Sequence, residues 1–311
     1  MKGLEISKKY YLEYGKKMLD EQFPSIKKYL AIGLVGPGSE CLGYDDVLSC
    51  DHDFEPGFCI FVPNDEKLID RKTLFNLERA YNKLPKTFLN YKRNFIQPAG
   101  LNRHGIITID DFYLDKIGKY IEDEMDFFKL QDSYLLMATN GEIFEDNYGL
   151  FTKIRNSLKH YPINVKKKKM VGCLIMMQQS GFYNYKRCIL RNEIEASQFA
   201  IIEFVKYAIQ MIFLLNDTYI PHYKWIFKAL KNLTCLNDCG NDLNYLLTTN
   251  NEGLIVNKKF TIIEKISNLI IERLLTDGYI NSLKNLEECA FYINDTITNN
   301  KIRNLDLLYA I

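Results

Sequence analysis

Hydrophobic positions in the first 120 residues follow two different patterns. Apolar residues recur at helical spacing over 7–30 and 65–83, whereas short apolar runs typical of buried strands lie at 29–35, 58–62 and 104–110. Residues 84–103 show neither pattern, and we expect a loop with a short helix there. The pattern predicts a domain in which an amphipathic N-terminal helix covers a sheet.

From about residue 122 the pattern changes to long helical stretches with few strand-like runs. Helical periodicity covers 150–158, 166–180, 193–216, 221–233, 242–248, 258–275 and 282–293. We therefore expect an α/β protein of the α+β class. Its two predicted domains are residues 1–121, with strands and helices, and residues 122–311, an all-helical bundle.

The composition is that of an ordinary globular protein. The hydrophobic share is 47%. The net charge of +1 neither attracts nor excludes nucleic acid overall. The N-terminus has no apolar segment typical of a signal peptide. The most apolar helix contains Glu203, Lys206 and Gln210, which are costly in a membrane. Eight cysteines scattered among apolar neighbours indicate reduced thiols. These features predict a cytoplasmic protein without membrane contact.

The densest group of glycines and polar side chains lies in residues 33–53, GLVGPGSECLGYDDVLSCDHD. An apolar run ends there in Gly36-Pro37-Gly38-Ser39, where the glycines permit positive φ and the proline stiffens the turn. Such a turn before a helix points backbone N–H groups outward, and Ser39 adds a hydroxyl donor. Gly36, Gly38 and Ser39 are therefore predicted to bind a phosphate.

Two carboxylates follow this turn. Asp51 and Asp53 stand before the apolar run at 58–62, and alternate residues of a strand point to the same face. Paired carboxylates suit two divalent cations about 3.5 to 4 Å apart, which hold the attacking and leaving oxygens in a phosphoryl-type displacement. Each motif by itself is also common in ordinary turns and on solvated strand edges. Their order and spacing favour the functional interpretation.

The order of these motifs resembles the signature of the polymerase-beta-like nucleotidyltransferase superfamily, in which Gly-Ser, a helix-length gap and Asp-x-Asp come before an apolar strand. The longer run GPGSECLGYDDVLSCDHDF is similar to the pattern of the family called domain of unknown function 4037. Further matches are GEIFED at 141–146, Gly149 with Arg155, Leu158, Tyr161-Pro162, and YIPHYKW at 219–225, so that the similarity runs from about residue 33 to about residue 230. The two-domain plan is similar to that of aminoglycoside nucleotidyltransferases.

The resemblance implies a nucleotidyltransferase core with a mixed sheet, followed by a helical domain that binds substrate or closes over it. It implies transfer of a nucleoside monophosphate from a nucleoside triphosphate to a hydroxyl acceptor, with release of pyrophosphate. Asp51 and Asp53 would hold Mg²⁺, as two ions, or Mn²⁺. The acceptor would be a small molecule, RNA or a protein.

One departure favours a second interpretation. After the second carboxylate the family pattern has an aromatic residue and Gly-Pro-Arg, whereas this chain has Phe54-Glu55-Pro56-Gly57. Any phosphate contact from that arginine is therefore missing. A catalytically inactive binding or regulatory protein with the nucleotidyltransferase fold is the alternative.

The superfamily usually takes a third carboxylate from its third strand. Asp110 and Asp111 are the candidates here. Adjacent residues of a strand point to opposite faces of the sheet, so only one of the two can face the site. We expect Asp110, which ends the apolar alternation, to be the third metal ligand or a base. Asp111 fits equally the N-cap of a helix that runs to Gly118.

Three features of the second half are further candidates. Glu193 falls where the resembling family has an acid, and it is a candidate general base for the acceptor hydroxyl, or a complement to the positive end of a helix. Lys224 is a candidate cation for a β- or γ-phosphate, whereas the neighbouring Trp225 is expected in the core. The run Lys166–Lys169 predicts a solvated face or, with Lys153, Arg155, Lys159 and His160, an RNA contact.

Overall fold

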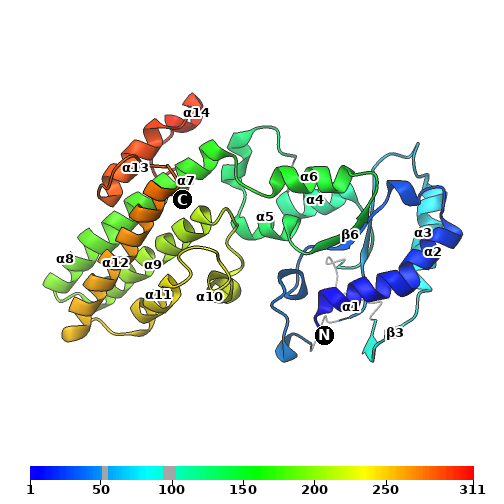
Figure 1. Ribbon diagram of the computed structural model, residues 1–311, viewed down its shortest axis with the longest axis horizontal. Coiled ribbons are helices and arrows are strands. Elements are labelled where there is room, and N and C mark those ends of the chain that lie inside the picture. The colour runs from blue at the N-terminus through cyan, green and yellow to red at the C-terminus, as the bar shows by residue number, and fades with distance from the viewer. Residues whose placement is uncertain (51–54, 94–102, 119) are drawn as a thin grey trace. The chain divides into compact units, whose positions relative to one another are not determined.

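The computed structural model describes residues 1–50, 55–93, 103–118 and 120–311. It divides into two compact units (Figure 1): unit 1 comprises residues 1–120 and 131–159, and unit 2 comprises residues 121–130 and 160–311. The predicted boundary between 121 and 122 lies where the chain first leaves unit 1. The chain then returns to unit 1 for residues 131–159, because a strand within this segment completes the sheet.

Unit 1 is built on a four-stranded mixed sheet, which confirms the predicted fold class. Its strand order is β5 (Gly105–Thr108), β2 (Cys59–Val62), β1 (Ala31–Leu34) and β6 (Glu142–Asp146). β1 runs antiparallel to β2 and to β6, and β2 runs parallel to β5. The strand β6 was not predicted from the sequence.

A small hairpin of β3 (Thr87–Phe88) and β4 (Tyr91–Lys92) lies where a loop with a short helix was expected. Its two turn residues, Leu89 and Asn90, have φ of 46° and 68°. Positive φ at both central residues is typical of the tight turns that join antiparallel strands. The hairpin therefore replaces the predicted structure in the described part of 84–103.

Helices cover both faces of the sheet (Figure 1). Ile60 and Val62 of β2 pack into a core with the N-terminal helices and α3, whereas Phe61 points to the opposite face and stacks on Phe151, with 4.1 Å between ring centroids. The first group comprises α1 (Gly3–Tyr10), a π-helical segment (Tyr11–Gly15), α2 (Lys16–Gln22) and α3 (Arg71–Asn82). The opposite group comprises α4 (Ile109–Ile117), α5 (Asp132–Thr139) and α6 (Leu150–Leu158).

The N-terminal helix starts and ends earlier than the predicted range of 7–30, and α3 begins later than the predicted residue 65. The side chain of Asp70 accepts a hydrogen bond from the N–H of Thr73 (2.8 Å), which caps α3. This cap sets the start of the helix, because it satisfies one of the N–H groups that lack a partner within the first turn.

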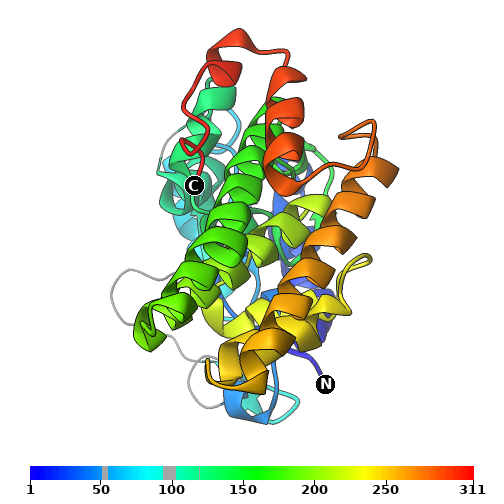
Figure 2. The same ribbon diagram turned by 90° about the vertical axis from the view of Figure 1, so that its left-hand side faces the viewer.

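Unit 2 is entirely helical. Its main helices are α7 (Ile163–Met177), α8 (Tyr185–Leu190), α9 (Ile194–Leu215), α10 (Ile226–Leu230), α11 (Cys239–Thr248), α12 (Leu254–Thr276), α13 (Leu286–Asp295) and α14 (Asn300–Arg303). α7 packs against both α9 and α13 (Figure 2). Among the described residues, α9 alone is long and apolar enough to cross a membrane, but 67% of that stretch is buried within the protein. It is the core helix that the sequence predicts.

The lysine run 166–169 is mostly buried, so the prediction of a solvated face was wrong. Lys168 is fully buried, and its ammonium donates to Asn294 Oδ1 (2.9 Å) and to two carbonyls at the end of α14. Lys166 pairs with Asp217 at 2.9 Å. Because Lys169 is also buried, three of these four lysines do not form the surface patch that binding of RNA requires.

Lys259 of α12 is a second fully buried lysine. Its ammonium donates to the carbonyls of Leu246 (3.0 Å) and Thr249 (2.9 Å) at the end of α11, and to Asn251 Oδ1 (2.9 Å). Burial lowers the pKa of Lys259 from 10.5 to about 8. Between these two values the unfolded chain binds more protons than the folded protein, so the free energy of unfolding rises with pH in this window.

We expect the variant Lys259→Met to lack this rise, which amounts to about 2 kcal/mol between pH 8 and pH 10. Urea unfolding of both proteins from about pH 7 to about pH 10 measures it. The buried tyrosines, whose pKa values burial raises, affect both proteins alike, so that the difference between the two isolates Lys259. A difference that does not change with pH would contradict the lowered pKa.

Candidate functional site

The glycine turn at residues 36–39 directly follows β1, as predicted. Gly36 and Gly38 have φ of +119° and +124°, which side chains other than hydrogen rarely allow. A Cβ at Gly38 would lie 2.5 Å from a carboxylate oxygen of Glu40 and closer still to the guanidinium of Arg103, so the ends of these two flexible side chains would have to shift. The positive φ is therefore what favours glycine at both positions.

Ser39 and Gly38 present unused donors. Within the described part of the chain, neither the N–H groups of Gly38 and Ser39 nor the Ser39 hydroxyl donates a hydrogen bond. Both residues are half-buried, so these donors can reach a ligand. Gly36 differs, because its N–H is already bonded to the side chain of Asn140. Gly36 therefore shapes the turn, and Gly38 and Ser39 are the residues that can donate to a phosphate.

Asn140 holds the turn through a reciprocal pair of hydrogen bonds. The N–H of Gly36 donates to Asn140 Oδ1, and Asn140 Nδ2 donates to the Gly36 carbonyl, both at 2.8 Å. Arg155 in turn donates to the carbonyls of Thr139 (3.1 Å), Asn140 (2.9 Å) and Gly141 (3.0 Å). Arg155 thus supports the turn, and its guanidinium does not belong to the surface contact with RNA that we predicted. Sequence reasoning missed Asn140 altogether.

Arg103 places a guanidinium beside the glycine turn. It forms an ion pair with Glu40, and the two side chains are only 10% and 9% exposed. Arg103 immediately precedes His104, whose Nδ1 lies 3.1 Å from Glu55 Oε1. The departure from the family pattern therefore has a local reason, because Glu55 orients the imidazole. A Cβ at Gly57 would lie 2.6 Å from the His104 ring, which excludes a larger residue there without rearrangement.

Lys116, in the last turn of α4, lies near Gly36 of the turn. Its Cε lies 3.7 Å from the position that a Cβ of Gly36 would occupy. Burial raises the pKa of the Cys59 thiol to about 12, and the charges of Lys116 and Arg103 partly counteract this rise. Neither cation was among the site residues predicted from the sequence.

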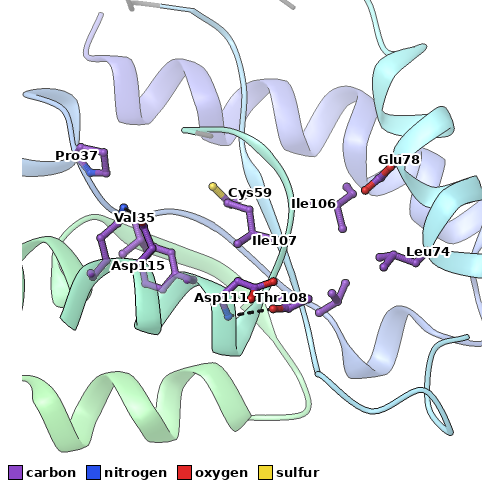
Figure 3. A pocket seen from close by; sticks show the side chains of 13 residues that line it. Val35, Pro37, Cys59, Leu74, Glu78, Ile106, Ile107, Thr108, Asp111 and Asp115 are labelled. Atoms are coloured by element: carbon purple, nitrogen blue, oxygen red, sulfur yellow. Dashed lines mark hydrogen bonds and ion pairs between the residues drawn. The ribbon is translucent and has the colours of Figure 1, made fainter. Parts of the chain in front are cut away.

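A pocket of about 450 Å³ adjoins the glycine turn (Figure 3). Val35, Pro37 and Asp115 lie at one end of it, Leu74, Glu78 and Ile106 lie at the other, and Cys59 lies between them. The walls of the pocket are about equally polar and apolar, and its volume is in the range of pockets for small ligands. The glycine turn and a ligand-sized pocket therefore meet at Pro37 within unit 1.

The third-carboxylate candidates occupy different places from those predicted. Asp110 belongs to α4, and not to the end of a strand, and it accepts a hydrogen bond from Asn64 (3.1 Å). Asp111 lines the pocket. Its N–H donates to Thr108 Oγ1 (3.0 Å), so that Thr108 is the N-cap of α4 and the prediction of this role for Asp111 was wrong. β5 ends at Thr108 because this cap starts the helix.

The predicted metal ligands Asp51 and Asp53 lie outside the described residues. Within the described ranges, no group of three histidine, cysteine, aspartate or glutamate side chains is arranged to hold a metal ion. The metal hypothesis therefore rests on Asp51 and Asp53. Asp111, the neighbour of the predicted Asp110, is a carboxylate that lines the pocket.

Glu193 and Lys224 both belong to unit 2. Glu193 is exposed at the N-terminus of α9 and makes no capping hydrogen bond with its side chain. Lys224 is exposed, and its ammonium lies 5.3 Å from the centroid of the Trp225 ring, with Lys228 at 5.2 Å from the same ring. Trp225 is half-buried, and so it is only partly the core residue that was expected.

Comparison with known families gives a match to the middle of the chain. Residues 127–226 match the model of a family described as Domain of unknown function (DUF4037). This part of the chain is similar to that family. The match contains Asn140 and Arg155, which hold the glycine turn, and it supports the predicted resemblance over these residues. No curated protein and no solved structure matches the chain.

Proposed function

We propose that this protein is a metal-dependent nucleotidyltransferase of the polymerase-beta-like kind. It would transfer a nucleoside monophosphate from a nucleoside triphosphate to a hydroxyl acceptor and release pyrophosphate. The observation that carries this proposal is the glycine turn after β1, which has unused donors on Gly38 and Ser39 and whose Pro37 lines a pocket of about 450 Å³. The mixed sheet beneath it agrees with the fold that the resemblance implies.

Each residue of the turn has a distinct part in this proposal. The amides of Gly38 and Ser39 and the Ser39 hydroxyl would bind phosphate oxygens, and Asn140 would keep the turn in the conformation that presents them. Asp51 and Asp53 would hold Mg²⁺, or Mn²⁺. When bound, the metal would neutralise charge on the phosphate oxygens. Asp111 is the better placed third carboxylate, because it lines the pocket.

The acceptor is less closely defined by the site. Glu193 would act as general base only if unit 2 presents it to the acceptor hydroxyl. A small molecule or a protein is favoured over RNA, because the lysine run on which the RNA hypothesis depended is mostly buried.

A nucleotide-binding protein without turnover is the second candidate. It is favoured by Glu55-Pro56-Gly57, which stands where the family pattern has Gly-Pro-Arg, and whose Glu55 and Gly57 accommodate His104. Pyrophosphate release in the presence of Mg²⁺ and a mixture of candidate acceptors distinguishes the two.

We expect at least one non-hydrolysable analogue of ATP, CTP, GTP or UTP to bind about tenfold more tightly with Mg²⁺ than without it. Isothermal titration calorimetry measures this binding. The variant Ser39→Ala should weaken it about tenfold, since a hydrogen bond to a charged group is lost. Ser157→Ala, which changes an exposed hydroxyl on α6, is the matched control and should have no effect. Absence of binding by all four analogues would overturn the proposed function.

A further inference from the structure

Lys116 is the one lysine or arginine among the described residues that line the pocket. Its side chain is only 11% exposed, and its stem packs near the Phe112 ring, with the ammonium 5.7 Å from the ring centroid. Lys116 Cε lies at van der Waals distance, 3.7 Å, from the position that a Cβ of Gly36 would occupy. The glycine turn and this lysine therefore meet at one end of the pocket.

The present partner of Lys116 is weakly held. Its ammonium pairs with Asp115, whose side chain is 60% exposed. Ion pairs with one partner in solvent contribute little to stability, because water competes for the carboxylate and salt screens the charge. A more highly charged anion that enters the pocket can therefore replace Asp115 at low cost.

The other charges of the pocket do not cancel this cation at the turn. The carboxylate of Glu40 is paired with Arg103. Glu78 lies at the opposite end of the pocket, beside Leu74 and Ile106, and the exposed Asp111 lies beside Thr108 (Figure 3). Lys116 and Cys59 both line the pocket, and the charge of Lys116 opposes the rise in the pKa of the Cys59 thiol.

We propose that Lys116 binds a phosphate group at the glycine turn, together with the amides of Gly38 and Ser39. An ammonium beside outward N–H groups is the combination that binds phosphate oxygens at such turns. Lys116 would thus have the role that the sequence suggested for Lys224. The identification of the anion as the triphosphate of a nucleotide rests on the proposed function, but the affinity of the site for phosphate can be tested without a nucleotide.

The test uses inorganic triphosphate as the probe and calorimetry on the full-length chain, without metal and at low salt. We expect Lys116→Met to weaken binding about tenfold or more, whereas Lys224→Met changes it less than about twofold. Lys116→Arg should retain most of the affinity, because it keeps the charge. The thermal midpoint of each variant shows whether it is folded, and Lys116→Gln replaces the methionine variant if that one is not.

Three outcomes decide the proposal. Loss of binding in Lys116→Met, with retention in Lys116→Arg and Lys224→Met, supports it. Equal binding by wild type and Lys116→Met, or no binding by the wild type, overturns it. Binding of triphosphate that depends on Lys116, in a protein that neither binds nucleotide analogues nor releases pyrophosphate, would support this inference while the proposed function fails.

Discussion

Replacing Asp53 with alanine is expected to lower the rate of Mg²⁺-dependent pyrophosphate release by about 10²- to 10³-fold and to leave the fold intact. In the proposed reaction, the negative charge that develops on the phosphate oxygens is offset by the metal, and a carboxylate ligand holds that metal in place. Asp51→Ala should have an effect of the same size, because the two carboxylates would hold the ions jointly. Pyrophosphate release by the purified variants, coupled to a colorimetric phosphate assay, measures the loss.

Two further variants make this result specific. Asp53→Asn keeps the volume of the side chain and removes its charge, so it should be nearly as impaired as the alanine variant. Glu21→Ala removes an exposed carboxylate of α2 in the same unit and should retain full activity. Full turnover by either aspartate variant would show that the metal assignment is wrong. Nucleotide binding without turnover in the wild type would instead favour the inactive binding protein.

Asn140→Ala is expected to lower the free energy of unfolding by about 2 to 4 kcal/mol. Asn140 is 9% exposed and Gly36 is buried, so the variant leaves both the N–H and the carbonyl of Gly36 without partners away from water. Each such group costs about 1 to 3 kcal/mol. Urea unfolding followed by circular dichroism measures the change. Because the turn loses its support, nucleotide binding should weaken in the same variant.

The matched control is Asn156→Ala, at an exposed position of α6, which should change the free energy of unfolding by less than about 0.5 kcal/mol. Asn140→Asp tests the geometry more finely. It keeps an acceptor for the Gly36 N–H but turns a carboxylate toward the Gly36 carbonyl, so it should also destabilise the protein. Unchanged stability in Asn140→Ala would contradict the structural role of this residue.

The elements that the sequence predicted well are those with strong local patterns. Residues 150–158 form α6 over the full predicted range, and the apolar runs at 29–35 and 58–62 contain β1 and β2. Their hydrophobic spacing alone distinguishes helix from strand. β6 was missed because three of its five residues are acidic and because, at the edge of the sheet, none of the five is fully buried. β6 pairs with β1, which is far away in the sequence, and no local sequence pattern predicts such a pairing.

The features of the candidate site also fall into those that a local sequence pattern predicts and those that it does not. The sequence by itself determined the glycine turn, with Gly38 and Ser39 as candidate donors, and a mixed strand-and-helix unit joined to a helical one, because each depends on residues close together in the chain. Only the tertiary structure decided what surrounds the turn: Asn140, bonded to Gly36 across 104 residues, and Lys116 at its side. The same holds for the lysine run, since Lys168 is buried against carbonyl acceptors more than 100 residues away. A charged side chain is satisfied by partners that folding brings to it, and sequence spacing does not reveal such partners.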